Sequence, residues 1–233
     1  MSPIGKQMTP IALSAKSALL LCGISQVGTR PAMMYELVIF DLGGVVVEVE
    51  SDRLVHQVSQ LLGRSFEEIQ QAIYHEDLLL PFELGRISAQ AYYDGLKRTL
   101  RLSWTYEQFV RAWNGIFTEN RDVTRIMHRL HTRHQLIALT NTNELHLSHI
   151  QATVPSLSVL SHWVASCDVG LRKPDPQFYR LALERVGVRA QAAVYIDDRP
   201  ELVEAGRGVG LTAIHFENSR QLEQDLQAIG LNL

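Results

Sequence analysis

Residues 36–44 read ELVIFDLGG and combine a short apolar run, one carboxylate and two glycines. Such a run, rich in β-branched and aromatic side chains, is typical of a buried strand, and the glycines that follow Asp41 indicate a tight loop. Further strands are predicted at 135–139, 193–196 and 212–215, with helical segments between them. Strands that alternate with helices predict an α/β fold built on a doubly wound, parallel sheet.

The stretch from residue 52 to residue 118 has a different pattern, because apolar residues such as Leu54 and Val58 recur there at helical spacing. No strand is predicted within it, and Ser88 is predicted to be a helix N-cap. We therefore expect an inserted bundle of about four helices. The predicted domains are a core at 35–50 and 119–233 and a helical cap at 51–118.

The composition argues against several classes of function. The chain has 233 residues, 46% apolar and 20% charged, so we expect one packed domain with a modest insert. A net charge of −3 without a basic block argues against nucleic acid as a partner. No apolar run approaches the roughly 18–20 residues that cross a bilayer, so no membrane partner is expected. Cys22 and Cys167 lack metal-ligand spacing, which favours a reducing, cytoplasmic compartment, and without a heptad pattern we expect a monomer.

Residues 1–34 need a separate interpretation. Lys6 and Lys16 accompany a short apolar stretch, and together they weakly resemble an export signal. The stretch is at the short end for such a signal, and Gly23 interrupts it. Because the compact pattern begins abruptly at Tyr35, we expect a disordered extension or a misassigned start instead.

Polar side chains follow the predicted strands at the points where those strands end. In open α/β sheets the ligand site lies beyond the carboxyl ends of the strands, so residues far apart in sequence can converge there. The residues concerned are Asp41, Thr140, Asn141, Lys173, Asp197 and Asp198. Taken singly, each has a more ordinary interpretation as a turn residue, a helix cap or a solvated lysine.

The combination of these residue types points to phosphoryl transfer. That chemistry needs a nucleophile, a metal ion held by carboxylates, and donors for the non-bridging phosphate oxygens. Asp41 can act as the nucleophile, and the adjacent carboxylates of Asp197 and Asp198 repel each other unless a cation is nearby. Magnesium prefers oxygen ligands and commonly takes one or two carboxylates plus substrate oxygens. The sequence thus predicts a magnesium-dependent phosphatase that acts on a small phosphorylated metabolite.

Four segments resemble, in order, the four motifs of the haloacid dehalogenase superfamily. They are FDLGGVV at 40–46, LTNTN at 139–143, LRKPDPQFY at 171–179 and YIDDRPELVEAG at 195–206. The resemblance implies a Rossmann-like core in which the long helical stretch after the first strand is the family's cap. Within the superfamily, the segments look most like the bacterial branch that includes glucose-1-phosphate phosphatase.

The resemblance also implies roles for the acidic residues. Asp41 attacks phosphorus and forms an aspartyl-phosphate intermediate. Its other carboxylate oxygen, the backbone carbonyl of Gly43 and the carboxylate of Asp198 bind Mg²⁺. Asp197 supports that metal site, directly or through water.

On the phosphate side, the resemblance implies that Thr140 and Asn141 hold phosphate oxygens. Lys173 offsets the charge between the nucleophile and the phosphoryl group, as a compact point charge suited to a shared acidic site. The implied substrate is a small phosphate monoester, a sugar phosphate such as glucose 1-phosphate.

One position departs from the family's pattern. Many phosphatases of the superfamily carry a second aspartate two residues after the nucleophile, as general acid and base, whereas this chain has Gly43 there. General acid–base catalysis is typically worth ~10²–10⁴-fold. Either another group protonates the leaving oxygen, or the substrate has a good leaving group, or the chain is a weak phosphatase.

The cap is expected to determine the substrate. The cap side chains considered as facing the site are His75, Glu76, Glu83 and Arg86, although charges on a solvated helix surface are their more ordinary interpretation. Asn143 and His146 follow the second motif and are candidates for the rim of the crevice. For His146, a place on the helix surface is favoured.

Three other functions fit the same residues. A hydrolytic 2-haloacid dehalogenase also uses an aspartate nucleophile but needs no metal, and the Asp197–Asp198 pair argues against it. A non-catalytic binding or regulatory module could keep this fold after losing the acid/base residue. A phosphotransferase or mutase begins with the same phospho-enzyme as a hydrolase.

Overall fold

The computed structural model describes residues 35–231. The predicted extension at 1–34 and Cys22 lie outside the described residues, so their interpretation stays a prediction. Within 35–231, no helix is both long and apolar enough to cross a membrane.

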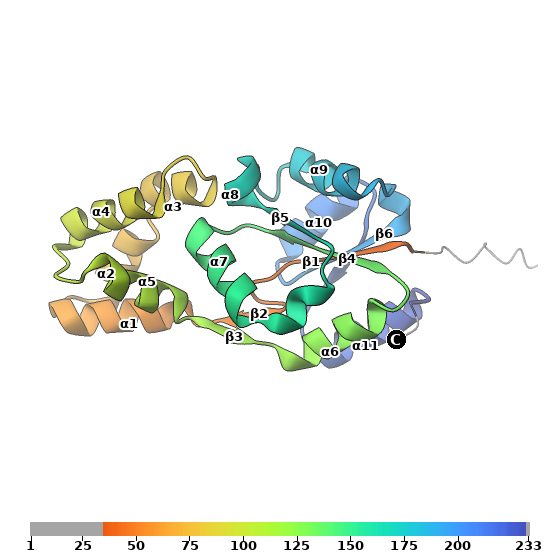
Figure 1. Ribbon diagram of the computed structural model, residues 1–233, viewed down its shortest axis with the longest axis horizontal. Helices are drawn as coiled ribbons and strands as arrows, with labels where there is room; N and C mark the ends of the chain where they lie inside the picture. Colours follow the sequence, from red (N-terminus) through yellow and green to blue (C-terminus); the bar gives the residue numbers. More distant parts are fainter. Residues whose placement is uncertain (1–34, 232–233) are drawn as a thin grey trace, which may run out of the picture. The chain divides into compact units, whose positions relative to one another are not determined.

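Five parallel strands form the central sheet, in the order β5-β4-β1-β6-β7 (Figure 1). They are β1 (Leu37–Phe40), β4 (Gln135–Thr140), β5 (His162–Ala165), β6 (Ala193–Asp197) and β7 (Thr212–His215). β1 is the middle strand, and Phe40 at its end pairs with Ala138 of β4 and Ile196 of β6. The chain adds β4 and β5 on one side of β1 and β6 and β7 on the other. This topology confirms the predicted doubly wound α/β sheet.

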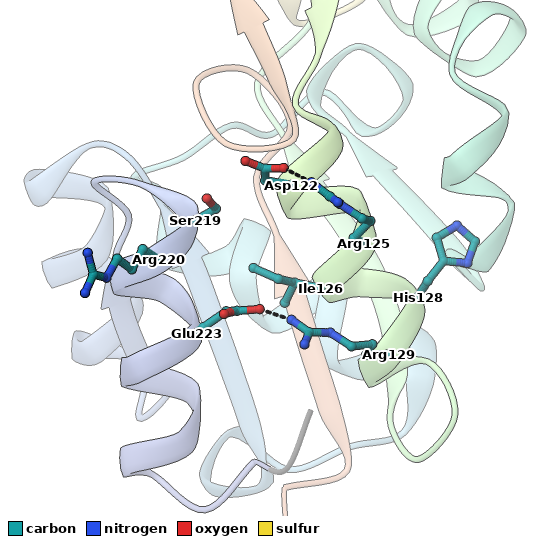
Figure 2. A pocket seen from close by; sticks show the side chains of 8 residues that line it. All are labelled: Asp122, Arg125, Ile126, His128, Arg129, Ser219, Arg220 and Glu223. Atoms are coloured by element: carbon teal, nitrogen blue, oxygen red, sulfur yellow. Dashed lines mark hydrogen bonds and ion pairs between the residues drawn. The ribbon is translucent and has the colours of Figure 1, made fainter.

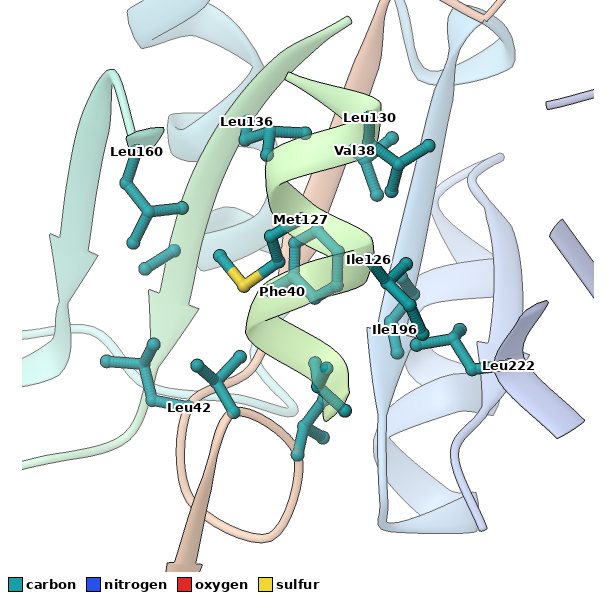
Figure 3. Packing of buried hydrophobic residues seen from close by; sticks show 14 of the residues in the cluster. Val38, Phe40, Leu42, Ile126, Met127, Leu130, Leu136, Leu160, Ile196 and Leu222 are labelled. Atoms are coloured by element: carbon teal, nitrogen blue, oxygen red, sulfur yellow. The ribbon is translucent and has the colours of Figure 1, made fainter. Parts of the chain in front are cut away.

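Helices cover both faces of the sheet because successive strand side chains point to opposite faces. Val38 and Phe40 pack against α6 (Figure 3), whereas Leu37 and Ile39 pack against α9. The first face is covered by α6 (Arg121–Leu130), α7 (Glu144–Thr153), the 3₁₀ helix η1 (Pro155–Val159) and α11 (Ser219–Ala228). The second face is covered by α9 (Pro176–Val186) and α10 (Pro200–Gly208). Short helical turns α8 (Ser166–Val169) and η2 (Ala190–Ala192) complete this part of the chain.

The insert contains five helices, one more than the sequence pattern predicts. They are α1 (Ser51–Leu62), α2 (Phe66–Ile73), α3 (Glu76–Glu83), α4 (Ala89–Leu100) and α5 (Tyr106–Asn114). The additional helix is α3, whose Pro81 obscures its helical pattern in the sequence. The predicted N-cap Ser88 is confirmed, because its side chain accepts a hydrogen bond from the amide of Ala91.

The insert has an apolar core of its own, centred on aromatic rings. Tyr92 stacks on Phe82 with the ring centroids 4.6 Å apart, and Trp113 lies 5.1 Å from Tyr92 and 5.5 Å from Phe109. The buried hydroxyl of Tyr92 donates to the carbonyl of Ile73 at 2.6 Å. The helices of the insert therefore hold one another without the sheet.

Two short strands join the insert to the sheet. β2 (Val47–Val49) and β3 (Phe117–Glu119) pair antiparallel, and the amide of Glu50 donates to the carbonyl of Ile116 at 2.8 Å. The expectation that no strand occurs between residues 52 and 118 is therefore wrong for Phe117 and Thr118. A three-residue strand is too short to show alternation, and its partner lies about seventy residues away in sequence. The exact division into domains stays a prediction.

Matched leucine substitutions will test how much the sheet core contributes. Leu136 of β4 is 0% exposed and Leu61 of α1 is 46% exposed. We expect Leu136→Ala to lower the free energy of unfolding by about 2–5 kcal/mol, because it removes buried methyl groups and leaves a cavity. Leu61→Ala should change it by less than about 0.5 kcal/mol. Urea denaturation measures both, and equal losses would contradict the described core.

Candidate active site

Asp41 lies directly after β1, at the carboxyl edge of the sheet. Its backbone amide donates to the carbonyl of Ile196 at 2.9 Å, which ties it to the neighbouring strand β6. Its carboxylate is buried, and Oδ1 accepts a hydrogen bond from the amide of Leu42 at 2.7 Å. The sheet and the following loop thus fix the orientation of this carboxylate.

A buried lysine joins two of the acidic residues. Lys173 Nζ lies 2.8 Å from Oδ2 of Asp41 and 2.7 Å from Oδ2 of Asp197. All three side chains are buried, and the ammonium also lies 5.7 Å from the ring centroid of Tyr195. Lys173 therefore supplies the positive charge that two desolvated carboxylates require.

Asp197 is held from several directions. Besides Lys173, its Oδ2 accepts a short hydrogen bond from the hydroxyl of Tyr195, and its Oδ1 accepts from the amide of Arg199 at 2.9 Å. Tyr195 was not among the predicted site residues, although residues two apart on a strand share a face and Tyr195 precedes Asp197 by two. These contacts occupy much of the hydrogen-bonding capacity of Asp197 and make it a partner of Lys173.

Asn141 positions Lys173 through the backbone. Its side-chain Nδ2 donates to the carbonyl of Lys173 at 3.0 Å, and its Oδ1 accepts from the amide of Lys173 at 2.8 Å. The side chain of Asn141 is thus engaged by Lys173, its backbone amide is not part of this pair, and the expectation that Asn141 holds phosphate oxygens stays a prediction. Thr140, at the end of β4, is buried beside it.

Three carboxylates form a cluster that could hold a metal ion. One oxygen from each of Asp41, Asp197 and Asp198 lies within 4.8 Å of the others. Asp198 is half-buried and lies against Gly44, where a Cβ atom would be 2.2 Å from its Oδ2. Gly44 also has a positive φ of 79°, so glycine is favoured there on both counts. The chain thus leaves room for the carboxylate of Asp198 beside the loop.

The donor set of this cluster fits Mg²⁺. All its donors are carboxylate oxygens, which magnesium prefers to nitrogen or sulfur. Burial raises the pKa of Asp198, and the neighbouring charge of Asp197 raises it further. A divalent cation would relieve that repulsion and favour the ionised forms.

Position 43 is bordered by an apolar side chain. A Cβ atom on Gly43 would lie 3.3 Å from Cγ2 of Val49, closer than most real contacts of this kind. Val49 is 42% exposed, which is unusual for a large apolar residue among the described residues. A side chain at position 43 would therefore crowd this methyl group, which would have to shift slightly.

The insert reaches the core through the end of α3. Glu83 Oε2 lies 3.1 Å from Nη1 of Arg172, the residue before Lys173. Ser166 Oγ lies 2.7 Å from the carbonyl of Glu83 and 2.9 Å from that of Thr142. Burial raises the pKa of Glu83, and Arg172 and Arg199 partly offset this effect. No sequence pattern indicated Ser166.

The other candidates from the insert do not share this contact. His75, Glu76 and Arg86 are exposed, as their ordinary interpretation predicts.

His146 of α7 does not lie free on the helix surface, the place that was favoured for it, because its ring stacks on Trp113 with the centroids 4.8 Å apart. That prediction is wrong because the partner ring comes from the insert, about thirty residues earlier in the chain.

A surface hollow of about 590 Å³ lies between α6 and α11 (Figure 2). Ion pairs join Arg125 to Asp122 and Arg129 to Glu223 along its wall. The residues that line it include none of those predicted for catalysis. We therefore place the candidate active site at the carboxylate cluster and not in this hollow.

Comparison with known proteins gives relatives for this arrangement. Residues 35–210 match the haloacid dehalogenase-like hydrolases. The chain is 25% identical over 207 residues to D-ribitol-5-phosphate phosphatase from Bacteroides thetaiotaomicron, covering 84% of this chain and 98% of that protein. It is 38% identical over 78 residues to flavin mononucleotide hydrolase 1 from Arabidopsis thaliana, a match that covers 33% of this chain and only 32% of that protein.

A solved structure supports the fold independently. It is a haloacid dehalogenase family enzyme from Bacteroides thetaiotaomicron in complex with magnesium and inorganic phosphate. The TM-score is 0.71 at 18% sequence identity, and the match covers 78% of this chain and 94% of that chain. This likeness confirms the Rossmann-like core with helical segments.

The pH dependence of stability will test the electrostatics of Asp41. Burial raises its pKa from 3.8 to about 6, Lys173 partly offsets the rise, and Asp197 adds to it. The folded state therefore binds more protons than the unfolded state between these values, and stability falls as pH rises through this window. In EDTA, we expect Asp41→Asn to be more stable than the wild type by roughly 1–3 kcal/mol at pH 7.5.

That difference should disappear at pH 4, where Asp41 is largely protonated in the folded state. Urea denaturation between pH 4 and pH 8 measures it. Asp77→Asn is the control, because the side chain of Asp77 is 93% exposed. A stability difference for Asp41→Asn that is independent of pH would contradict the raised pKa.

Proposed function

The chain belongs to the haloacid dehalogenase-like hydrolases, and from this premise we propose that it is a magnesium-dependent phosphatase of small phosphate monoesters. The observation that carries the proposal is the Asp41 carboxylate, held beside Asp198 and paired with the buried ammonium of Lys173. A nucleophile, a metal-binding carboxylate and a fixed cation are the parts that phosphoryl transfer needs.

In the proposed first step, a carboxylate oxygen of Asp41 attacks phosphorus and the bond from phosphorus to the leaving oxygen breaks. The products are an aspartyl-phosphate and the alcohol, once the leaving oxygen has gained a proton. In the second step, water attacks the phosphorus of the aspartyl-phosphate, which releases inorganic phosphate and restores the Asp41 carboxylate. Splitting one difficult displacement into two easier ones is the usual gain of nucleophilic catalysis.

The cation side of the site is assigned to residues that already lie together. Asp41, Asp198 and the backbone carbonyl of Gly43 would hold Mg²⁺, and Asp197 would support the site mainly through Lys173. When bound, Mg²⁺ supplies positive charge that stabilises the phosphoryl oxygens in the transition state. Lys173 adds a second, fixed positive charge beside the nucleophile.

Phosphate oxygens would be held at the end of β4. We assign them the hydroxyl of Thr140 and the backbone amide of Asn141, because the side chain of Asn141 is engaged by Lys173. The side chain of Asn141 would then position Lys173 while its backbone amide binds the substrate.

A sugar or polyol phosphate is the substrate class that we favour, with glucose 1-phosphate as one candidate. The relative aligned over most of both chains is a D-ribitol-5-phosphate phosphatase, whose name specifies a phosphorylated polyol. The pairing of Glu83 with Arg172 places polar groups of the insert beside the loop that carries Lys173. Such groups suit a hydroxyl-rich leaving group.

Phosphate release is the direct test of this function. We expect release from a panel of sugar phosphates, polyol phosphates and p-nitrophenyl phosphate with MgCl₂, and none with excess EDTA. Asp41→Asn should lower kcat by roughly 10³-fold or more, because an amide is a very poor nucleophile. Asp77→Asn, exposed on α3, should retain the wild-type rate. Magnesium-dependent turnover that persists in Asp41→Asn would refute the assignment.

Leaving groups of graded pKa will test the consequence of Gly43. For the wild type, we expect kcat/KM for aryl phosphates to fall steeply as the leaving-group pKa rises, because no side chain at position 43 donates a proton. Gly43→Asp combined with Val49→Ala should flatten this dependence and raise the rate on the poorest leaving group by up to ~10²-fold. Gly43→Asp alone should gain less, since Val49 crowds the new side chain. A flat dependence in the wild type would show that another acid is present.

A further inference from the structure

Trp113, Asn143 and His146 form a closed set of hydrogen bonds between the insert and the core. Trp113 is near the end of α5, Asn143 is the N-cap of α7, and His146 lies in the first turn of α7. Asn143 Oδ1 lies 3.3 Å from Nε1 of Trp113, and Asn143 Nδ2 lies 3.1 Å from Nδ1 of His146. His146 Nε2 lies 3.1 Å from the carbonyl oxygen of Trp113.

The partners determine where the protons lie in this set. The indole N–H of Trp113 can only donate, and the backbone amide of His146 also donates to Asn143 Oδ1, at 3.1 Å. The carboxamide oxygen of Asn143 must therefore face these two donors, which leaves its NH₂ group facing Nδ1 of His146. Nδ1 consequently accepts, and Nε2 carries the hydrogen that the carbonyl of Trp113 accepts.

Two aromatic side chains pack against the imidazole of the half-buried His146. Its ring stacks on Trp113 at an angle of 16° and meets the edge of Phe117 with the centroids 4.7 Å apart. Burial lowers the pKa of His146 to about 3, the hydrogen bond to Trp113 opposes this, and His149 lowers it further.

The titratable side chain that acts on this ring is His149 of α7, whose charge opposes protonation of His146. Glu144, two residues before His146, accepts a hydrogen bond from the amide of Ala89 in the insert. Among residues 35–231 no carboxylate forms an ion pair with His146, so the ring remains uncharged.

This set of bonds lies next to the proposed phosphate-binding residues. Asn143 lies three residues after Thr140 and two after Asn141. The side chain of Asn141 forms two hydrogen bonds with the backbone of Lys173. We propose that His146 is a positioning residue, which as its Nε2–H tautomer locks α5 of the insert to the loop that orients Thr140, Asn141 and Lys173. In this role His146 need not contact the substrate. Its effect on catalysis rests on the proposed function.

An isosteric change at Asn143 tests the proton assignment. Asn143→Asp keeps an oxygen acceptor for Trp113 and for the helix, but it replaces the NH₂ group facing His146 with a second oxygen. We expect ¹⁵N NMR of histidine-labelled wild type to show His146 as an Nε2–H tautomer that does not titrate between pH 5 and pH 8. In Asn143→Asp, His146 should hold a proton on both nitrogens at pH 7.

The signals are assigned by their loss in His146→Phe. A wild-type His146 that titrates near pH 6.5, or that carries its proton on Nδ1, would overturn the proposal. The NMR experiment depends only on the fold, so its outcome is independent of whether the chain is a phosphatase.

Removal of the imidazole tests the positioning role. His146→Phe keeps the stacking on Trp113 but removes both side-chain hydrogen bonds, and we expect kcat to fall at least tenfold with the best substrate of the panel. The affinity for inorganic phosphate in MgCl₂, measured by calorimetry, should fall similarly. Ile69→Val, a buried change in α2 of the insert, should leave both unchanged.

Circular dichroism and thermal melts confirm that each variant is folded before the comparison is made. If His146→Phe matches Ile69→Val in both kcat and phosphate affinity, the residue is merely structural and the positioning role is refuted. Phosphate binding supplies a readout even if no ester is hydrolysed, which separates this failure from a failure of the proposed function.

Discussion

The site depends on one buried ammonium shared by two buried carboxylates. Lys173 is 2.8 Å from Asp41 and 2.7 Å from Asp197, and each of the three comes from a different segment of the chain. Desolvating each ion costs several kcal/mol, so such a group is tolerated only when its geometry is good and its remaining hydrogen bonds are satisfied. The amide of Leu42 provides such a bond to Asp41, and the hydroxyl of Tyr195 and the amide of Arg199 provide them to Asp197. The register of β1 against β6 therefore matters chemically as well as structurally, because it sets the distance between the two acids.

The cluster carries an acidic excess that Lys173 alone does not balance. Lys173 balances one of the three negative charges at most, and Asp198 remains without a basic partner at ion-pair distance among residues 35–231. Burial and mutual repulsion then raise the pKa of Asp41 and of Asp198. Crowded carboxylate oxygens of this kind are the donors that a small, doubly charged ion such as Mg²⁺ prefers. The pH dependence of stability and the fit to a divalent cation are thus two aspects of one electrostatic arrangement.

Much of the architecture could be predicted, because the spacing of apolar residues that indicates a strand or a helix is a local property of the sequence. Apolar runs such as Val38 to Phe40 indicate strands, and the carboxyl-end rule then brings Asp41 and Asp197 together. The prediction failed where a distant segment decides the outcome. β3 exists because β2 lies beside it, and His146 packs against a ring from α5. The contact between the side chain of Asn141 and Lys173 was not predicted at all, since nothing near Asn141 in the sequence indicates that partner.

The paired strands β2 and β3 bring the two ends of the insert to one point. The amide of Glu50 donates to the carbonyl of Ile116, so the point where the chain enters the insert lies beside the point where it leaves. A segment with adjacent ends can be shortened, lengthened or exchanged without altering the strands on which the carboxylates are mounted. The insert has its own aromatic core, so such an exchange need not unfold either part. Natural variation can therefore replace the insert as a whole module, while the strands that position Asp41 and Asp197 are inherited intact.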